Sequence, residues 1–105
     1  MEPSLIIEVY GIPGEVGHCP ACNHIQTLLG ALQAPYTFHK VMFKDDSGIN
    51  YNRPTIEALA KRIGCYPSLS IRYPVIYVNN KKMLNIKHFK ETLINLGYDQ
   101  DIIED

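Results

Sequence analysis

Two cysteines, Cys19 and Cys22, are the residues of this chain whose type and spacing predict chemistry. A Cys-x-x-Cys pair beside a strand–helix–strand pattern is typical of a redox dithiol, which cycles between two thiols and a disulfide. The thiolate is the reactive form of cysteine, so the surroundings of each sulfur decide its reactivity. The pair therefore predicts thiol–disulfide exchange if one of the two sulfurs is stabilised as an anion.

The residues that follow the first cysteine favour the start of a helix. Pro20 suits the first helical position, because its missing N–H would be unpaired there and its φ angle is already helical. Cys19 then takes the N-cap position, where the helix dipole stabilises an anion by about 0.3–1 kcal/mol, or up to about 2 kcal/mol when partly buried. We therefore expect Cys19 to be the attacking thiolate. Cys22 lies one turn further on the same helix face, and we expect it to be the resolving thiol.

Two other functions of this cysteine pair stay open. A Cys-x-x-Cys pair is half of many zinc sites, but such a site needs a second close pair of Cys or His residues. The chain has three cysteines, of which the third, Cys65, stands alone, and its four histidines form no pair with the required spacing. We therefore expect no bound metal in the chain by itself. An inert pair of structural thiols is the second alternative, which the helix-start pattern disfavours.

His18 directly precedes the first cysteine and is a further candidate site residue. A protonated imidazole beside Cys19 would lower the pKa of that thiol, because a nearby positive charge stabilises the thiolate. A neutral side chain in an exposed loop is the alternative. Both interpretations are compatible with the sequence.

Length and composition predict a single domain over residues 1–105. Hydrophobic residues make up 46% of the chain, charged residues 20%, and the formal net charge is −1. Because no basic stripe is evident, we expect no nucleic-acid partner, and no apolar run approaches the roughly 20 residues of a membrane span. The odd number of cysteines and the acidic start of the chain argue against a secreted disulfide scaffold. We expect a monomer in the reducing cytoplasm.

The hydrophobic pattern predicts a β-α-β-α-β-β-α order of elements around the cysteine pair. We expect strands at 4–10, 36–43, 75–78 and 81–85, and helices at 20–33, 54–64 and 87–96. The first strand–helix–strand unit should be parallel and right-handed, and the last two strands should form an antiparallel hairpin around Asn79-Asn80. The result is a mixed four-stranded sheet with helices on both faces. Residues 44–53 are expected to be a polar loop, and the acidic tail from about residue 98 to be loosely held.

With the dithiol motif Cys19–Cys22 after the first strand and Tyr73-Pro74 before the third, the chain resembles a glutaredoxin. The short phage-type dithiol glutaredoxins are the most similar members, although they usually carry tyrosine where this chain has Ala21. The resemblance covers residues 4–97 and implies an α/β, thioredoxin-like fold. It also implies that Pro74 is in the cis form beside the two sulfurs, and that the backbone of Tyr73 binds an extended substrate.

The positions that hold glutathione in this family differ in the present chain. Glutaredoxins usually have Gly-Gly after the last hairpin and an acidic residue two places on, whereas this chain has Leu84-Asn85 and then Lys87. A bulky leucine restricts the backbone approach that glycine permits. Lys87 is a candidate for a charge-assisted contact with a glutathione carboxylate. Other basic residues could make the same kind of contact: Arg72, Lys81 and Lys82.

The resemblance implies a disulfide oxidoreductase that reduces protein or glutathione mixed disulfides through Cys19 and Cys22. It implies glutathione as the reductant, no tightly bound cofactor, and a disulfide-bearing protein client, for which ribonucleotide reductase is one candidate. The departures leave a first alternative, a thioredoxin-like general dithiol donor that binds glutathione weakly. A second alternative is a non-enzymatic module on the same fold that binds a metal together with a partner chain. If a phage encodes the chain, the cytoplasm is that of its host.

Overall fold

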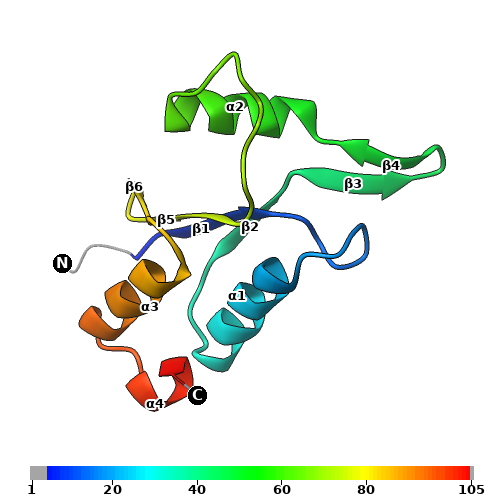
Figure 1. Ribbon diagram of the computed structural model, residues 1–105. Helices are drawn as coiled ribbons and strands as arrows, with labels where there is room; N and C mark the ends of the chain where they lie inside the picture. The colour runs from blue at the N-terminus through cyan, green and yellow to red at the C-terminus, as the bar shows by residue number, and fades with distance from the viewer. Residues whose placement is uncertain (1–4, 105) are drawn as a thin grey trace.

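The computed structural model describes residues 5–104 of the chain. Its strands are β1 (Ile7–Gly11), β2 (Thr37–Lys40), β3 (Met42–Asp45), β4 (Gly48–Tyr51), β5 (Val75–Val78) and β6 (Lys81–Lys82). Its helices are α1 (Pro20–Ala31), α2 (Arg53–Ile63), α3 (Ile86–Asn95) and α4 (Gln100–Glu104). Together these elements form an α/β fold around a mixed four-stranded sheet (Figure 1). Among the helices of residues 5–104, none is long and apolar enough to cross a membrane.

The main sheet has the strand order β2-β1-β5-β6. β1 pairs in parallel with β2, placing Val9 opposite Phe38, and antiparallel with β5, placing Val9 opposite Ile76. β5 and β6 form the antiparallel hairpin that the sequence predicts. The predicted mixed four-stranded sheet is therefore confirmed. Since β1 lies between two other strands, the loop that leaves its carboxyl end and leads to the cysteines starts in the middle of the sheet.

Apolar side chains cover both faces of this sheet. The cluster on one face joins β1 and β5 to α1, α3 and α4, and includes Ile7, Val9, Ile25, Leu29, Ile76, Val78, Phe89, Leu93 and Ile103. The cluster on the other face joins the same strands to α2, and includes Tyr10, Ile56, Leu59, Val75 and Tyr77. Figure 1 shows α2 on the opposite side of the sheet from the other helices. The prediction of helices on both faces is confirmed, and all four residues of β5 are buried because both faces are covered.

Residues with left-handed backbone conformation end several elements at the predicted places. Asn79 and Asn80 have φ angles of 50° and 68° in the turn between β5 and β6, as a two-residue hairpin turn requires. Gly64 has φ 97°, and its N–H donates to the carbonyl of Ala60 at 2.9 Å. Gly97, with φ 99°, follows the end of α3. Each of these residues lets the chain reverse or change direction where a strand or helix ends.

The prediction of one strand over 36–43 followed by a polar loop over 44–53 is wrong. The chain leaves the main sheet at Val41, which is 1% exposed. The Val41 N–H donates to the carbonyl of Gly11 at 3.1 Å, and its carbonyl accepts from the N–H of Asn52 at 2.8 Å. Between these bonds β3 and β4 form a separate antiparallel hairpin, which projects from the rest of the molecule (Figure 1).

The turn of this hairpin is organised by the carboxylate of Asp45. Its Oδ1 atom accepts hydrogen bonds from the N–H and the hydroxyl of Ser47, at 2.8 and 2.6 Å, and from the side-chain amide of Asn50 at 3.0 Å. The hydroxyl bond is the main reason that the pKa of Asp45 is lowered. Gly48 supplies the positive φ of 109°. The Asp-Asp-Ser-Gly sequence is itself a turn signal, and it would have indicated a hairpin rather than a loop.

The tail was expected to be loosely held, and for the described residues this is wrong. Residues 100–104 form α4, which contacts α1 and α3. Ile103 is fully buried, at 0% exposure, in the larger apolar cluster. The tail is mostly acidic, so its composition alone does not indicate that Ile103 packs into the core. Leu96, at the end of α3, is by contrast 47% exposed.

An ion pair fastens α2 to the sheet. The Arg62 guanidinium donates to Glu8 Oε2 at 2.8 Å and to the Tyr10 hydroxyl at 3.0 Å, and it lies 3.6 Å from the centre of the Tyr77 ring. His39 Nε2 lies 3.3 Å from the other carboxylate oxygen of Glu8. The hydrogen bond from Arg62, aided by His39, lowers the pKa of Glu8 below its ordinary value of 4.5. The charged carboxylate therefore stabilises the folded state.

We expect Glu8→Gln to lower the free energy of unfolding by about 1–3 kcal/mol at pH 7, the usual value of a hydrogen bond to a charged group. Because the folded-state pKa is depressed, this contribution is fully present above pH 4.5 and is lost as the pH falls through the lower folded-state pKa. Urea denaturation at pH 7 and at pH values below 4.5 measures both effects. Glu57→Gln is the control, since its pair with Arg53 lies within α2 and is exposed; it should change stability by less than about 0.5 kcal/mol.

Candidate redox site

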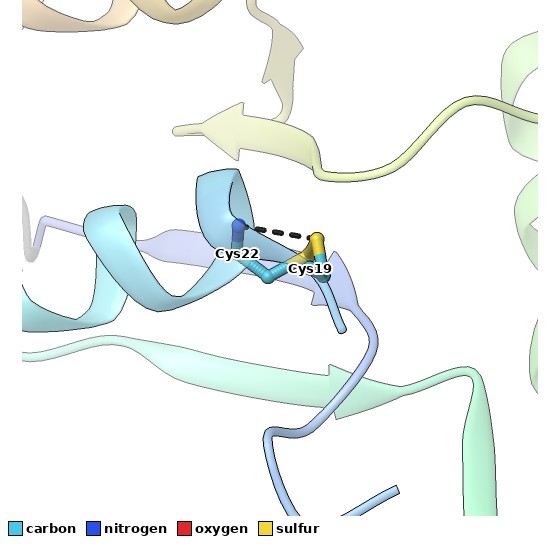
Figure 2. Close-up of a disulfide and its surroundings, with 2 residues drawn as sticks. All are labelled: Cys19 and Cys22. Atoms are coloured by element: carbon cyan, nitrogen blue, oxygen red, sulfur yellow. Dashed lines mark hydrogen bonds between the residues drawn. A yellow bond between two sulfur atoms is a disulfide. The ribbon is translucent and has the colours of Figure 1, made fainter. Parts of the chain in front are cut away.

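The cysteine pair lies at the start of α1, close to the end of β1. Cys19 and Cys22 are joined by a disulfide in the structure (Figure 2). Cys19 is the N-cap residue of α1, and Pro20 occupies the first turn. The backbone N–H of Cys22 donates to Cys19 Sγ at 3.2 Å (Figure 2). The predicted N-cap position of Cys19 is thus confirmed, and this sulfur is the one at the positive end of the helix dipole.

The two cysteines differ slightly in their exposure to solvent. Cys19 is 8% exposed, whereas Cys22 is 0% exposed. In thiol–disulfide exchange the attacking thiolate must come into line with the substrate S–S bond, so a cysteine with some exposure can meet a substrate disulfide more easily than a fully buried one. This difference favours Cys19 as the thiol that attacks a substrate disulfide and Cys22 as the resolving thiol.

Gly11, the last residue of β1, makes room for the buried sulfur. A Cβ atom at this position would lie 3.0 Å from Cys22 Sγ and 3.2 Å from the Phe38 ring. Both contacts are tighter than ordinary van der Waals packing. The end of the central strand therefore holds Cys22 in place because residue 11 has no side chain.

We expect Gly11→Ala to lower the free energy of unfolding by about 1–3 kcal/mol, the cost of overpacking a filled site. Gly30→Ala is the matched control, since no atom lies within 4 Å of the added Cβ on α1, and it should raise stability by about 0.5–1 kcal/mol. Urea denaturation of the oxidised proteins measures both changes. Equal effects of the two substitutions would contradict the packing of Cys22 against Gly11.

A surface groove of about 570 Å³ runs beside the dithiol motif. It is lined by Ala21, which lies between the two cysteines, and by Tyr73 and Pro74. The peptide bond between Tyr73 and Pro74 is cis. The structure therefore brings together the cysteine motif and the Tyr73-Pro74 pair, two segments that lie about 50 residues apart in the sequence.

Comparison with known proteins finds a relative of this chain in a phage. It is 61% identical over 99 residues, 94% of this chain and 95% of the relative, to an uncharacterized 11.8 kDa protein in the Gp55-nrdG intergenic region of Enterobacteria phage T4. The chain belongs to the family of this phage protein. No family model matches the sequence.

The groove beside the dithiol motif carries several basic residues and is called the basic groove below. Arg72, Lys82 and Lys87 line it together with Tyr73 and Pro74. All three basic residues are exposed. The structure therefore brings the predicted site residue Lys87 to the groove, along with two of the other three basic candidates. Lys81, the remaining candidate, is not among the residues that line it.

His18 is exposed and is not among the described residues that line the groove. Its neighbour Cys19 receives its hydrogen bond from the backbone of Cys22. This arrangement favours the exposed-loop interpretation of His18 over a role in stabilising the thiolate.

The start of α3 closes one end of the groove in a way that sequence analysis missed. The Asn85 side chain caps this helix by accepting from the N–H of His88 at 2.8 Å, and His88 Nδ1 accepts from the N–H of Leu84 at 3.0 Å. Leu84 lines the groove and is 78% exposed. An asparagine just before a helical pattern is a preferred N-cap, and that signal would have identified Asn85. Two backbone N–H groups at this end are therefore already bonded.

Cys65 is partly exposed. Its thiol donates to the carbonyl of Ser68 at 3.4 Å. It lies near Tyr73, whose pKa is raised by burial and, to a smaller degree, by Cys65. Within residues 5–104, no group of three or more His, Cys, Asp or Glu side chains is placed to hold a metal ion.

Proposed function

We propose that the protein is a glutaredoxin-like thiol–disulfide oxidoreductase with a thioredoxin-like fold. The observation that carries the proposal is Cys19 Sγ at the N-cap of α1, accepting the Cys22 N–H at 3.2 Å, with Cys22 as its disulfide partner. Such a sulfur is stabilised as a thiolate, which is the nucleophile in exchange. The strand order β2-β1-β5-β6, with the cysteines after β1, supports the fold.

In the proposed reaction the Cys19 thiolate attacks one sulfur of a substrate disulfide. The substrate S–S bond breaks, the leaving thiolate takes up a proton, and a mixed disulfide with Cys19 remains. Cys22 then loses its proton and attacks Cys19 Sγ, which releases the second substrate thiol and forms the Cys19–Cys22 disulfide. Two electrons have passed from the enzyme dithiol to the substrate. Two glutathione thiols return the enzyme to the dithiol form and leave as glutathione disulfide.

The Tyr73-Pro74 segment is proposed to hold the substrate backbone. Proline at the start of a strand has no N–H to pair, so the backbone of Tyr73 before it can bond an extended chain. This mode of binding adds a strand to an existing edge and does not depend on substrate sequence. It would place a substrate sulfur beside the dithiol motif, because Ala21, Tyr73 and Pro74 line one groove.

Glutathione is proposed as the reductant, bound in the basic groove. Glutathione carries two carboxylates, and Arg72, Lys82 and Lys87 supply positive charges along the groove. Charge-assisted hydrogen bonds of this kind are stronger than neutral ones. A disulfide-bearing protein in the cytoplasm of a phage host, such as ribonucleotide reductase, is the proposed client, and the protein is proposed to act as a monomer.

A thioredoxin-like dithiol donor with weak glutathione binding is the second candidate function. One observation favours it: Leu84 projects into the groove at 78% exposure, and its N–H is already bonded to His88. A carboxylate at this end would have to displace a bonded partner or bind through exposed lysines alone. Exposed ion pairs contribute little, about 0–1 kcal/mol each.

The coupled glutathione assay separates the two candidates. NADPH consumption is followed with glutathione, glutathione reductase and a low-molecular-weight mixed disulfide as substrate. Steady turnover supports the glutathione-dependent enzyme. No turnover, together with insulin reduction in the presence of dithiothreitol, supports the thioredoxin-like donor. Failure in both assays overturns the proposed oxidoreductase.

The position of the groove can be tested in the same assay. We expect Lys87→Glu to raise the KM for glutathione by about three- to tenfold, because it replaces an attractive charge by a repulsive one. Lys81→Glu makes the same charge change on β6 outside the groove and is the control. Both variants are compared at an ionic strength near 0.15 M, where charges farther apart than about 8 Å are screened. Equal KM values for the two variants would place glutathione elsewhere.

A further inference from the structure

The β3–β4 hairpin presents an apolar face to solvent. In its register Met42 lies opposite Tyr51, and Lys44 lies opposite Ile49. Since side chains two apart on a strand share a face, these four residues lie on one side of the hairpin. Ile49 is 55% exposed and Tyr51 is 71% exposed. Exposed apolar residues that gather on one surface mark a binding site more often than single ones do.

This face continues into a second groove, of about 500 Å³, between the hairpin and the body of the protein. Met42 and Tyr51 line it from the hairpin, and Ile12 and Leu69 line it from two loops. Apart from Arg53, Ser70 and two tyrosine hydroxyls, the lining is apolar. Covering this apolar lining with an apolar ligand would remove it from water, which is favourable.

The second groove shares one lining residue with the groove beside the dithiol motif. Tyr73 lines both this groove and the basic groove beside the dithiol motif. Ile12 belongs to the loop that leads from β1 to Cys19. A tripeptide bound in the basic groove has no need of the second groove, whereas a longer chain that crosses Tyr73 would enter both. An extended polypeptide substrate that passes Tyr73 would therefore continue into the apolar groove.

We propose that the second groove and the hairpin face bind an extended apolar segment of a protein substrate, adjacent to the cysteine whose disulfide Cys19 reduces. The substrate class is thus a polypeptide disulfide flanked by apolar residues, rather than a small disulfide. Ile49 and Tyr51 select the substrate by burying apolar surface. The inference rests on the proposed oxidoreductase function and names the substrates that this function prefers.

The test uses the pre-reduced full-length protein and two synthetic peptides. Each peptide carries one cysteine as a mixed disulfide with 5-thio-2-nitrobenzoate. One has leucine and valine on both flanks of the cysteine, and the other has serine and glycine. Attack of Cys19 on the peptide sulfur releases coloured thionitrobenzoate, and 5,5′-dithiobis(2-nitrobenzoate) serves as the small disulfide without a peptide. Stopped-flow absorbance gives a second-order rate constant for each.

We expect the wild-type protein to react about tenfold faster with the apolar peptide, equivalent to about 1.4 kcal/mol. The double substitution Ile49→Ser/Tyr51→Ser should reduce this preference to about twofold or less, while its rate with the small disulfide stays within about twofold of wild type. Phe43→Ser is the matched control. Phe43 is 39% exposed and pairs with Asn50, on the opposite face of the same hairpin, so the preference should persist in this variant.

Each contrary result has a distinct meaning. No reaction with the small disulfide overturns the oxidoreductase function, and the substrate inference with it. A normal reaction with the small disulfide but equal rates with the two peptides overturns the substrate inference alone. Equal losses in Phe43→Ser and the double variant also overturn it, since the effect would then not depend on the face. So would a dimer in sedimentation analysis that the double variant dissociates, because a second copy would then cover the hairpin.

Discussion

Cys19→Ser is expected to abolish disulfide reduction, with kcat/KM falling by about a thousandfold or more. Serine at the N-cap of α1 keeps the helix start but is not ionised at neutral pH, so the attacking thiolate is lost and only the fully buried Cys22 remains of the dithiol. Cys22→Ser should behave differently. Its Cys19 thiolate can still exchange with glutathione mixed disulfides, but it cannot resolve a mixed disulfide with a protein, so only protein-disulfide reduction should fall. The coupled NADPH assay and insulin reduction measure the two activities.

Cys65→Ser is the control for both substitutions. Cys65 lies outside the dithiol motif, and its thiol bonds the carbonyl of Ser68, an acceptor that a serine hydroxyl can also reach. Its activity should stay within about twofold of wild type. A fully active Cys19→Ser protein would exclude the mechanism, and an inactive Cys65→Ser protein would move the reactive thiol to a different part of the fold.

Ile103→Ala is expected to lower the free energy of unfolding by about 2–5 kcal/mol. Ile103 is 0% exposed within the cluster that joins α1, α3 and the sheet, so removing its outer carbons leaves a cavity. Urea denaturation at neutral pH measures the change. For a small domain this loss is a large part of the total stability.

Ile102→Ala makes the same chemical change one residue earlier. Ile102 is 40% exposed, so its replacement should change stability by less than about 0.5 kcal/mol. A large difference between the two variants establishes α4 as part of the folded core. If Ile103→Ala were as harmless as Ile102→Ala, the tail would be loosely held after all, as its composition suggests.

The proposed function joins two features of different origin. In this proposal the helix start around Cys19 supplies a reactive sulfur, and the two grooves that share Tyr73 bind a reductant and a protein substrate. Gly11 links them, because the central strand can approach Cys22 Sγ only where a side chain is missing. The chemistry thus depends on α1, and the selectivity depends on elements that surround it.

Much of the fold is encoded in local patterns of the sequence. The N-cap position of Cys19 follows from Pro20 beside it, because the missing N–H of proline suits the first helical turn. The β5–β6 hairpin follows from Asn79-Asn80, since asparagine tolerates positive φ, and the buried faces of α1 and α2 follow from their apolar spacing. These signals involve residues within one or two turns of each other, so they can be recognised without knowing where the rest of the chain lies.

Tertiary structure decided the features that depend on residues far apart. The N–H of Val41 still bonds Gly11 in the main sheet, but its carbonyl accepts from the N–H of Asn52, and this bond to a residue beyond the hairpin, not a local propensity, separates β2 from the β3–β4 hairpin. Ile103 is buried because α1 and α3 leave an apolar gap that one turn of helix fills. Both grooves arise where loops from different parts of the chain meet at Tyr73. The N-cap position of Cys19 is local, because the residues of one helix turn create it, whereas a groove needs several segments at once and exists only in the folded chain.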